Sequence, residues 1–370
     1  MKFSRVGAAI ALTTALGLGL SACASNNPGT GGDEGGNGGG GGEQQLTGTL
    51  SGGGASSQES AMLAWIDGFK SEQSGMEVLY DVVGSGTGRE GFVAGKYTFA
   101  GSDAAMKQED GAKAEQCGDS GVINIPAYIS PVALAYNLPD VKAENIKMDA
   151  ETIAAIFTGK INKWNDPKIA EQNEGVDLPD LAITVVVRGD SSGTTENFTS
   201  YLEANAADTW TYGEVEDWPT DLKAESAQQT GGVVGLTKQT EGAITYADAS
   251  AVEGLGTVAV GVGGEYVPYS SDAASKAVET GKRTGEGNDM AVELDRTTEE
   301  PGVYPIVLVS YHIYCQKYAD QETADMVKAF AKYMVSADGQ KTAEGSAGNA
   351  PLSEKLSGEA TEAIDSIGVQ

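Results

Sequence analysis

The run VVVRGDSSGTTENFTSYLEA, residues 185–204, holds the side chains best suited to bind an anion. Its apolar, β-branched start predicts a buried strand, and the residues from Thr195 onward predict a helix. The turn between them, Arg188 to Thr194, consists mainly of small hydroxyl and glycine residues. A helix that begins there leaves backbone N–H groups free at the positive end of its dipole. With the forked cation of Arg188, these groups predict a site for a tetrahedral oxyanion.

The same order of strand, glycine and hydroxyl turn, and helix occurs elsewhere in the chain. SGGGASS follows a predicted strand that ends at Leu50, and GSGTGREG follows one that ends near Val83. One such turn is common in α/β proteins, whereas several in one chain suggest a shared role. Strands are predicted at 46–50, 76–83, 97–100, 122–127, 132–136, 183–187, 243–246 and 306–314. Helices are predicted between most of them, which favours an α/β fold.

Residues 1–22 have the features of a secretory signal peptide. Lys2 and Arg5 form a positive start, and the apolar stretch that follows is too short to span a membrane. The segment LSAC, which ends at Cys23, resembles a bacterial lipobox. We therefore expect Cys23 to be lipidated and to anchor the protein to the outer face of a bacterial cell membrane. An uncleaved membrane anchor is the alternative.

The glycine-rich segment 23–45 is expected to be a tether, since it contains no apolar residues that could form a core. About 325 residues remain, enough for two domains. Apart from Cys23, the cysteines are Cys117 and Cys315. An even pair outside the cell predicts a disulfide between them, with two separate buried thiols as the alternative.

The chain is strongly acidic, with 53 acidic and 24 basic residues and a formal net charge of −29. This charge excludes a nucleic-acid-binding protein, which would be basic. It also repels anions at long range. An anionic ligand must therefore be held by local dipoles and hydrogen bonds.

Among enzymes, a hydrolase is the alternative that the sequence motifs support best. Gly189 to Gly193 matches the nucleophile elbow G-x-S-x-G, with Ser191 as the nucleophile and His312 as the base. However, His312 lies in the apolar run IVLVSYHIY, which predicts a strand, whereas the base of a catalytic triad normally lies on a loop. No oxyanion segment of the His-Gly-Gly kind accompanies it. These features favour a structural role for His312.

Other motif matches are weaker. GDSG at 118–121 has no histidine upstream to act as a base, and a single histidine without paired cysteines gives no metal site. The spacing of Gly86, Gly88 and Gly91 matches a dinucleotide fingerprint. A lone match of this kind is poorly specific, and a secreted protein has no nicotinamide supply. We expect neither a metal nor a cofactor.

Taken together, the turns resemble the phosphate-binding lipoprotein of bacterial Pst-type ABC transporters, in its actinobacterial form. The resemblance covers almost the whole chain after the tether, and its pieces occur in the order of the family. They are GGGASS (52–57), VGSGTGRE (83–90), FAGSDAAM (99–106), IPAYISPVALAYNL (125–138), IFTGKINKWNDPKI (156–169), VVVRGDSSGTTENF (185–198), GAITYAD (242–248) and YPIVLVSYHI (304–313).

The resemblance implies a two-lobed periplasmic-binding-protein fold of type II, with two α/β domains, a two-strand hinge and a ligand cleft between the lobes. Lobe I is expected to comprise 46–127 and 255–370, and lobe II 128–254. The chain is expected to pass between the lobes twice, and its return to lobe I is placed between residues 254 and 305. The implied function is capture of inorganic phosphate outside the cell and delivery to a membrane permease. The protein is then a monomeric binding protein, not an enzyme, and binds no nucleic acid.

The resemblance also implies the phosphate ligands on four turns. They are Ala55, Ser56, Ser57, Ser85, Asp103, Arg188, Asp190, Ser192, Gly193 and Thr194. One departure concerns the first turn, where many members have Thr-Phe or Ser-Phe and this chain has Ser56-Ser57, followed by Gln58. Asp190, two residues after Arg188, is expected to hold the guanidinium fork.

Asp103 is expected to select the ligand. A carboxylate beside a dianion is repulsive unless it accepts a proton from the ligand. Phosphate keeps a proton at neutral pH and sulfate does not. A helix cap after Gly101-Ser102 is the alternative role of Asp103. Another oxyanion, such as sulfate or molybdate, is the alternative ligand, and a secreted serine esterase is the enzyme alternative.

Overall fold

The computed structural model describes residues 45–370. The predicted signal peptide, the lipidation site Cys23 and all but the last residue of the tether lie outside the described residues. Every helix within 45–370 is too short or too polar to cross a bilayer.

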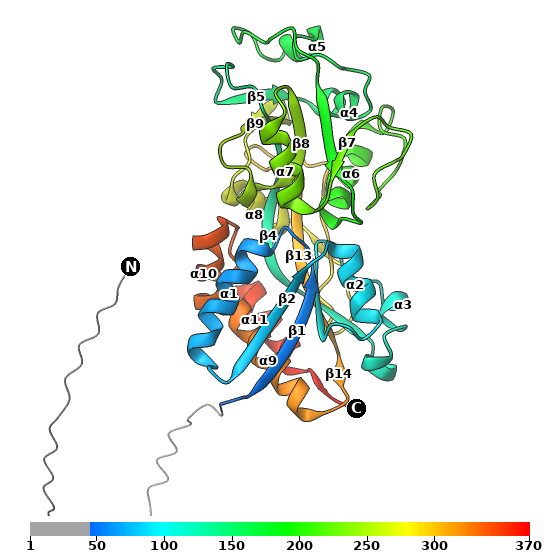
Figure 1. The fold of residues 1–370 in the computed structure, drawn as a ribbon, viewed down its shortest axis with the longest axis vertical. Coiled ribbons are helices and arrows are strands. Elements are labelled where there is room, and N and C mark those ends of the chain that lie inside the picture. The colour runs from blue at the N-terminus through cyan, green and yellow to red at the C-terminus, as the bar shows by residue number, and fades with distance from the viewer. Residues whose placement is uncertain (1–44) are drawn as a thin grey trace, which may run out of the picture. The chain divides into compact units, whose positions relative to one another are not determined.

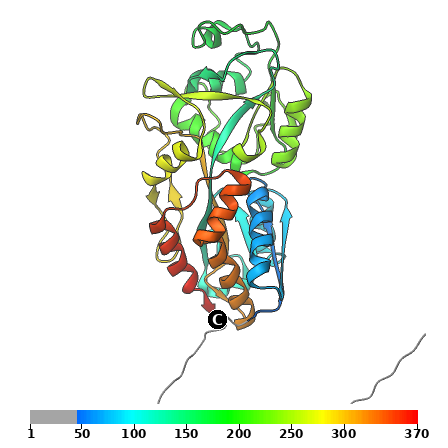
Figure 2. The ribbon, with the colours of Figure 1, turned by 90° about the vertical axis from the view of Figure 1, so that its left-hand side faces the viewer.

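The first lobe contains the parallel strands β1 (Gly48–Gly54), β2 (Met76–Val82) and β3 (Phe99–Ser102), in the order β2-β1-β3. Helices α1 (Glu59–Glu72), α9 (Gln321–Val335), α10 (Ala337–Ala347) and α11 (Glu354–Asp365) cover one face of this sheet, as Figure 2 shows. The short helices α2 (Ser85–Val93) and α3 (Gln108–Gly111) lie on the other side (Figure 1). Elements from the two ends of the described chain therefore pack against each other here.

The second lobe contains β5 (Asn145–Met148), β6 (Thr184–Arg188), β7 (Glu225–Ala227), β8 (Ala243–Asp248), β9 (Gly256–Val262) and β10 (Glu265–Val267). Its helices are α4 (Ala150–Phe157), α5 (Pro167–Ala170), α6 (Gly193–Ala206) and α7 (Gln229–Gln239). Strand β6 lies between β8 and β7 and is parallel to both. Figure 1 shows these elements together, on the side of the body away from β1.

Two long strands join the lobes. The first half of β4 (Val122–Tyr136) pairs with β13 (Val307–Cys315), from Cys315↔Val122 to Val307↔Pro131. The second half of β4 pairs with β8, from Val132↔Asp248 onward. One strand thus serves two sheets, and the change of partner falls between Pro131 and Val132.

The remaining elements are short. They are η1 (Glu115–Ser120), η2 (Ala249–Ala251), α8 (Ser271–Glu279), β11 (Lys282–Arg283), β12 (Val292–Glu293), β14 (Lys317–Tyr318) and β15 (Gly368–Val369). Strands β9 and β10 continue the sheet of the second lobe, because β9 pairs with both β4 and β5.

Most predicted elements occur within a few residues of their expected bounds. The prediction of two separate strands at 122–127 and 132–136 is wrong, because β4 is continuous. Prolines normally interrupt strands, but Pro126 lies at a register shift opposite Ser310 and Tyr311, and Pro131 lies where the pairing partner changes. Bulges and strand ends are the places where a sheet tolerates proline. Helix α10 was not predicted.

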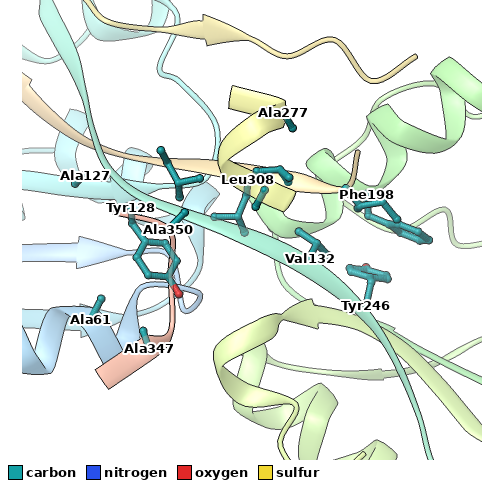
Figure 3. Packing of buried hydrophobic residues seen from close by; sticks show 14 of the residues in the cluster. Ala61, Ala127, Tyr128, Val132, Phe198, Tyr246, Ala277, Leu308, Ala347 and Ala350 are labelled. Atoms are coloured by element: carbon teal, nitrogen blue, oxygen red, sulfur yellow. The ribbon is translucent and has the colours of Figure 1, made fainter. Parts of the chain in front are cut away.

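The hydrophobic core runs through both lobes along β4 and β13. Tyr128, Val132 and Leu308 lie on these strands and are fully buried. Figure 3 shows them between Ala61 and Ala347 of the first lobe and the aromatic side chains of the second. There Phe198 and Tyr246 stack with ring centroids 4.6 Å apart. The linking strands are therefore packed on both sides, and their geometry is fixed by burial.

The disulfide expected between Cys117 and Cys315 is present, so the alternative of two separate thiols is wrong. Cys117 lies in η1 and Cys315 at the end of β13, and both are fully buried. The bond closes a loop with a sequence separation of 198 residues. It ties the segment after β3 to the strand that returns from the second lobe.

We expect the Cys117→Ala/Cys315→Ala variant to lose about 2–5 kcal/mol of unfolding free energy, because the unfolded chain gains the freedom that the closed loop removes. Urea unfolding followed by circular dichroism measures the change. Wild-type protein treated with a reductant should show a similar shift of the midpoint. An unchanged midpoint in the double variant would show that the bond does not contribute to stability.

Candidate functional site

The predicted turns come together around the carboxylate of Asp103, which is 4% exposed. Its Oδ1 accepts hydrogen bonds from the hydroxyls of Ser57 and Ser310, both at 2.5 Å. Its Oδ2 accepts one from the Thr194 hydroxyl at 2.9 Å. Ser57 and Asp103 belong to the first lobe, whereas Thr194 belongs to α6 of the second. The carboxylate therefore joins the two lobes.

The capping role considered for Asp103 is wrong. Helix α3 begins only at Gln108, and the carboxylate bonds to hydroxyls rather than to the N–H groups of a helix. The backbone of Asp103 is also held. Its N–H donates to Ser85 Oγ at 3.1 Å, and its carbonyl accepts from Asn197 Nδ2 at 2.8 Å. Each of these contacts reduces the freedom of the carboxylate.

Arg188 and Asp190 form the ion pair that the sequence predicts. Arg188 Nε donates to Asp190 Oδ1 at 2.8 Å, and Nη2 donates to Asp190 Oδ2. The two side chains are 2% and 6% exposed. Within residues 45–370, Nη1 of Arg188 has no hydrogen-bond partner. One side of the guanidinium fork is thus fixed, and another N–H group is free for an anion.

Helix ends supply further donors. Helix α6 begins at Gly193 and α2 at Ser85, so their first N–H groups have no acceptors within the helix. Ser192 is the N-cap of α6 and accepts from Thr195 N at 3.2 Å. Its hydroxyl proton remains available. These positions give a positive potential on both sides of the cleft.

The first turn also contacts the second lobe. Ser56 Oγ accepts from the Thr230 N–H at 3.0 Å and lies 2.9 Å from Thr230 Oγ1. Ala55 lies one residue earlier. Its N–H donates to the Gly101 carbonyl at 2.9 Å and is therefore used by the sheet. Ala55 and Ser56 stay predicted ligands, although only the hydroxyl of Ser56 faces across the cleft.

The lobes approach so closely that a Cβ atom would collide with the opposite lobe at several glycines, among them Gly193 and Gly84. A Cβ atom at Gly193 would lie 2.8 Å from Asp103 Cβ and 2.9 Å from Ser85 Oγ. A Cβ atom at Gly84, where φ is +90°, would lie 2.5 Å from Asp190 Oδ2. The glycines therefore serve contact between the lobes as well as any approach of a ligand.

A second set of charges bridges the lobes beside this site. Arg89 of α2 donates to Ser102 Oγ at 2.7 Å and forms an ion pair with Glu216. Burial, reinforced by the nearby carboxyl of Glu216, raises the pKa of Glu196 well above its usual value. Burial acts to raise the pKa of Glu216, but the charge of Arg89 and the hydrogen bonds from Glu196, Arg89 and Ser191 together keep this pKa below its usual value. Of the two carboxyls, Glu196 is therefore the one that holds a proton more readily.

The hydrolase arrangement does not occur. Ser191 Oγ donates to Glu216 Oε2 at 2.8 Å, whereas His312 is buried in β13 and its Nε2 lies 2.8 Å from Gln58 Oε1. Burial lowers the pKa of His312 to about 3. The expectation that His312 is a strand residue is confirmed.

Sequence reasoning missed several residues of this site, among them Ser310 and Thr230. Both are buried, and each bonds to a predicted residue. For Ser310 a signal was available, because a serine in the apolar run VLVSYHIY needs a buried partner. For Thr230 we find no signal, since its partner Ser56 is 174 positions away.

Relatives identify the class of this fold. Residues 40–338 match the sequence model of the PBP superfamily domain. A high-affinity periplasmic phosphate-binding protein solved with bound phosphate superposes with a TM-score of 0.69 at 21% identity, covering 87% of this chain and 99% of that one. The protein is therefore a two-lobed binding protein of the PBP superfamily, which confirms the predicted fold class.

Two curated relatives are more similar in sequence. Phosphate-binding protein PstS 3 of Mycobacterium leprae is 34% identical over 374 residues, and PstS 2 of Mycobacterium tuberculosis is 33% identical over 381 residues. Each alignment covers 99% of this chain and 100% of the relative. The chain belongs to the Pst-type phosphate-binding protein family. Both relatives are named for binding and not for catalysis, in line with the predicted absence of enzyme activity.

We expect Asp190→Ala to lower the unfolding free energy by about 3–5 kcal/mol, because it leaves the buried charge of Arg188 unpaired. Urea unfolding measures this change. Asp180→Ala is the matched control, since its ion pair with Lys163 is exposed and should contribute little. Equal stabilities of the two variants would contradict the assignment of a buried ion pair.

Proposed function

We propose that this protein captures inorganic phosphate between its lobes outside the cell and delivers it to the permease of an ABC transporter. The main support for this proposal is the Asp103 carboxylate, which accepts hydrogen bonds from hydroxyls of both lobes. On the turn before α6, the guanidinium of Arg188 is paired with Asp190 on one side only. Membership of the Pst-type family supports the choice of phosphate.

The chemistry fits a singly protonated oxyanion. Arg188 and the N–H groups at the starts of α2 and α6 can offset negative charge, while the oxygens of Asp103 can only accept protons. Phosphate supplies an O–H for that acceptor at neutral pH. Sulfate has none, so its charge would face the carboxylate at short range in a buried site. Sulfate and molybdate are the rival ligands that a competition experiment separates.

The ligand shell that we propose is the predicted one. It consists of Ala55, Ser56, Ser57, Ser85, Asp103, Arg188, Asp190, Ser192, Gly193 and Thr194. Within it, Asp190 acts by holding Arg188. The close contact of Gly193 with Asp103 supports a closed arrangement of the lobes.

We further propose that lobe I is built from both ends of the sequence and lobe II from its middle. The pairing of β9 with β5 and β10 favours a return of the chain to lobe I after Val267. This position is later than the predicted lobe boundary at 254/255 but lies within the interval 254–305. The proposal includes a lipid anchor at Cys23 on the outer membrane face and a monomer as the working unit.

Arg188→Ala should abolish measurable phosphate binding in titration calorimetry, because it removes the positive side chain of the shell. Asp103→Asn should weaken phosphate binding and narrow its advantage over sulfate, because the amide can donate a hydrogen bond to either anion. Arg283→Ala is the control, since that arginine is 41% exposed and lies outside the site. Phosphate binding by Arg188→Ala at wild-type strength would refute the proposed function.

Gly193→Ala should weaken phosphate binding at least tenfold, because the added Cβ collides with Asp103 and Ser85 when the lobes are closed. Small-angle scattering should also show no compaction on adding phosphate. Gly235→Ala in α7 is the matched control, since a Cβ there meets nothing within 4 Å. Wild-type affinity in the Gly193 variant would mean that binding does not require this contact between the lobes.

A further inference from the structure

A chain of buried polar side chains leads to Asp103 from inside the first lobe. Gln58, Ser310 and His312 are each 0% exposed. Around them the lobe is apolar and aromatic. The Trp65 and His312 rings form a T-shaped pair with centroids 5.8 Å apart, and Phe99 stacks on His312 with centroids 5.3 Å apart. Polar groups in such a place must satisfy one another.

The orientation of the Gln58 amide follows from its neighbours. Its Nε2 lies 3.3 Å from the Tyr311 carbonyl oxygen, which can only accept a hydrogen bond. The Oε1 atom therefore faces His312 Nε2 at 2.8 Å and requires a proton on that nitrogen. On the other side of the ring, His312 Nδ1 lies 3.1 Å from Tyr314 Oη.

His312 carries a single proton in this setting, because burial lowers its pKa to about 3. With that proton on Nε2, the Nδ1 atom accepts from the Tyr314 hydroxyl. The direction of each hydrogen bond is then fixed from Tyr314 through His312 to Gln58.

The last step concerns Ser310. Gln58 Nε2 donates to Ser310 Oγ at 2.5 Å, so the serine cannot return its own proton to Gln58. That proton has an acceptor in Asp103 Oδ1, also at 2.5 Å. Ser57 donates to the same oxygen. Asp103 Oδ1 thus receives two hydroxyl protons.

We propose that Gln58 and His312 are positioning residues that fix Ser310 as a donor to Asp103, and so make Asp103 an obligate acceptor that requires a protonated ligand. The inference rests on the proposed phosphate-binding function and names the determinant of its selectivity. Without the Ser310 proton, the Asp103 carboxyl is free to act as a donor itself. Binding of a fully deprotonated anion such as sulfate is then less unfavourable than in the wild type.

The test measures the dissociation constants of phosphate and sulfate by calorimetry for wild type, Ser310→Ala and Gln58→Met. We expect the ratio of the sulfate constant to the phosphate constant to fall about tenfold in both variants, the loss of about one hydrogen bond to a charged group. Ser310→Thr keeps the hydroxyl and should retain most of the wild-type ratio.

Gln340→Met is the matched control. Gln340 is also buried, and its Nε2 donates to the carbonyls of Ala127 and Met334, away from the site. This variant should lose stability but keep the selectivity ratio. A ratio within twofold of wild type in both Ser310→Ala and Gln58→Met would overturn the inference. Failure of the wild type to bind phosphate would instead refute the proposed function.

A second measurement needs no substitution. His312 is the single histidine of the chain, so nitrogen-15 NMR of protein purified without a histidine tag reports its state without assignment work. We expect a neutral ring with the proton on Nε2 between pH 5 and pH 8, roughly the range below and above its ordinary pKa. A neutral ring with its proton on Nδ1 alone would leave Gln58 Oε1 without a donor from His312 and contradict the inference even if the variants failed to fold.

Discussion

The structure of the site depends on the need of one buried carboxylate for hydrogen-bond donors. A carboxylate removed from water is costly unless its oxygens are satisfied. Asp103 obtains donors from the turn before α1, from β13 and from α6. These segments are far apart in sequence and belong to both lobes. The need of the Asp103 oxygens for donors therefore favours the closed arrangement of the lobes. The same need favours a ligand that carries a proton of its own.

The linking strands make this dependence mechanically possible. Strand β4 pairs with β13 in one half and with β8 in the other, so the change of partner at Pro131 and Val132 is the point where the two sheets meet. Ser310 lies on β13 at the register shift beside this region. Ser310, which donates to Asp103, thus lies on one of the strands that join the lobes.

Local sequence determined what could be predicted. The Arg188–Asp190 pair lies within one turn, and the helix starts follow from glycine and hydroxyl residues after short strands, so both were predicted correctly. Ser310 and Thr230 were not predicted, because their roles arise from contacts with residues 207 and 174 positions away in the sequence. The continuity of β4 was not predicted for a different reason. Its prolines indicate a break unless the bulge and the change of partner are known.

The glycine motifs show why letter matches pointed to several functions at once. Gly193 belongs to a nucleophile-elbow pattern and Gly86 to a dinucleotide pattern, yet a Cβ at either position would collide with the opposite lobe, at Asp103 and at Ser191 respectively. Closing two lobes around a small anion needs the same short side chains as binding a pyrophosphate or exposing a nucleophile. What distinguishes these functions is the partner of each neighbouring polar group. Here Ser191 pairs with a carboxylate, His312 is held neutral in a strand, and the acceptor that remains at the centre is Asp103.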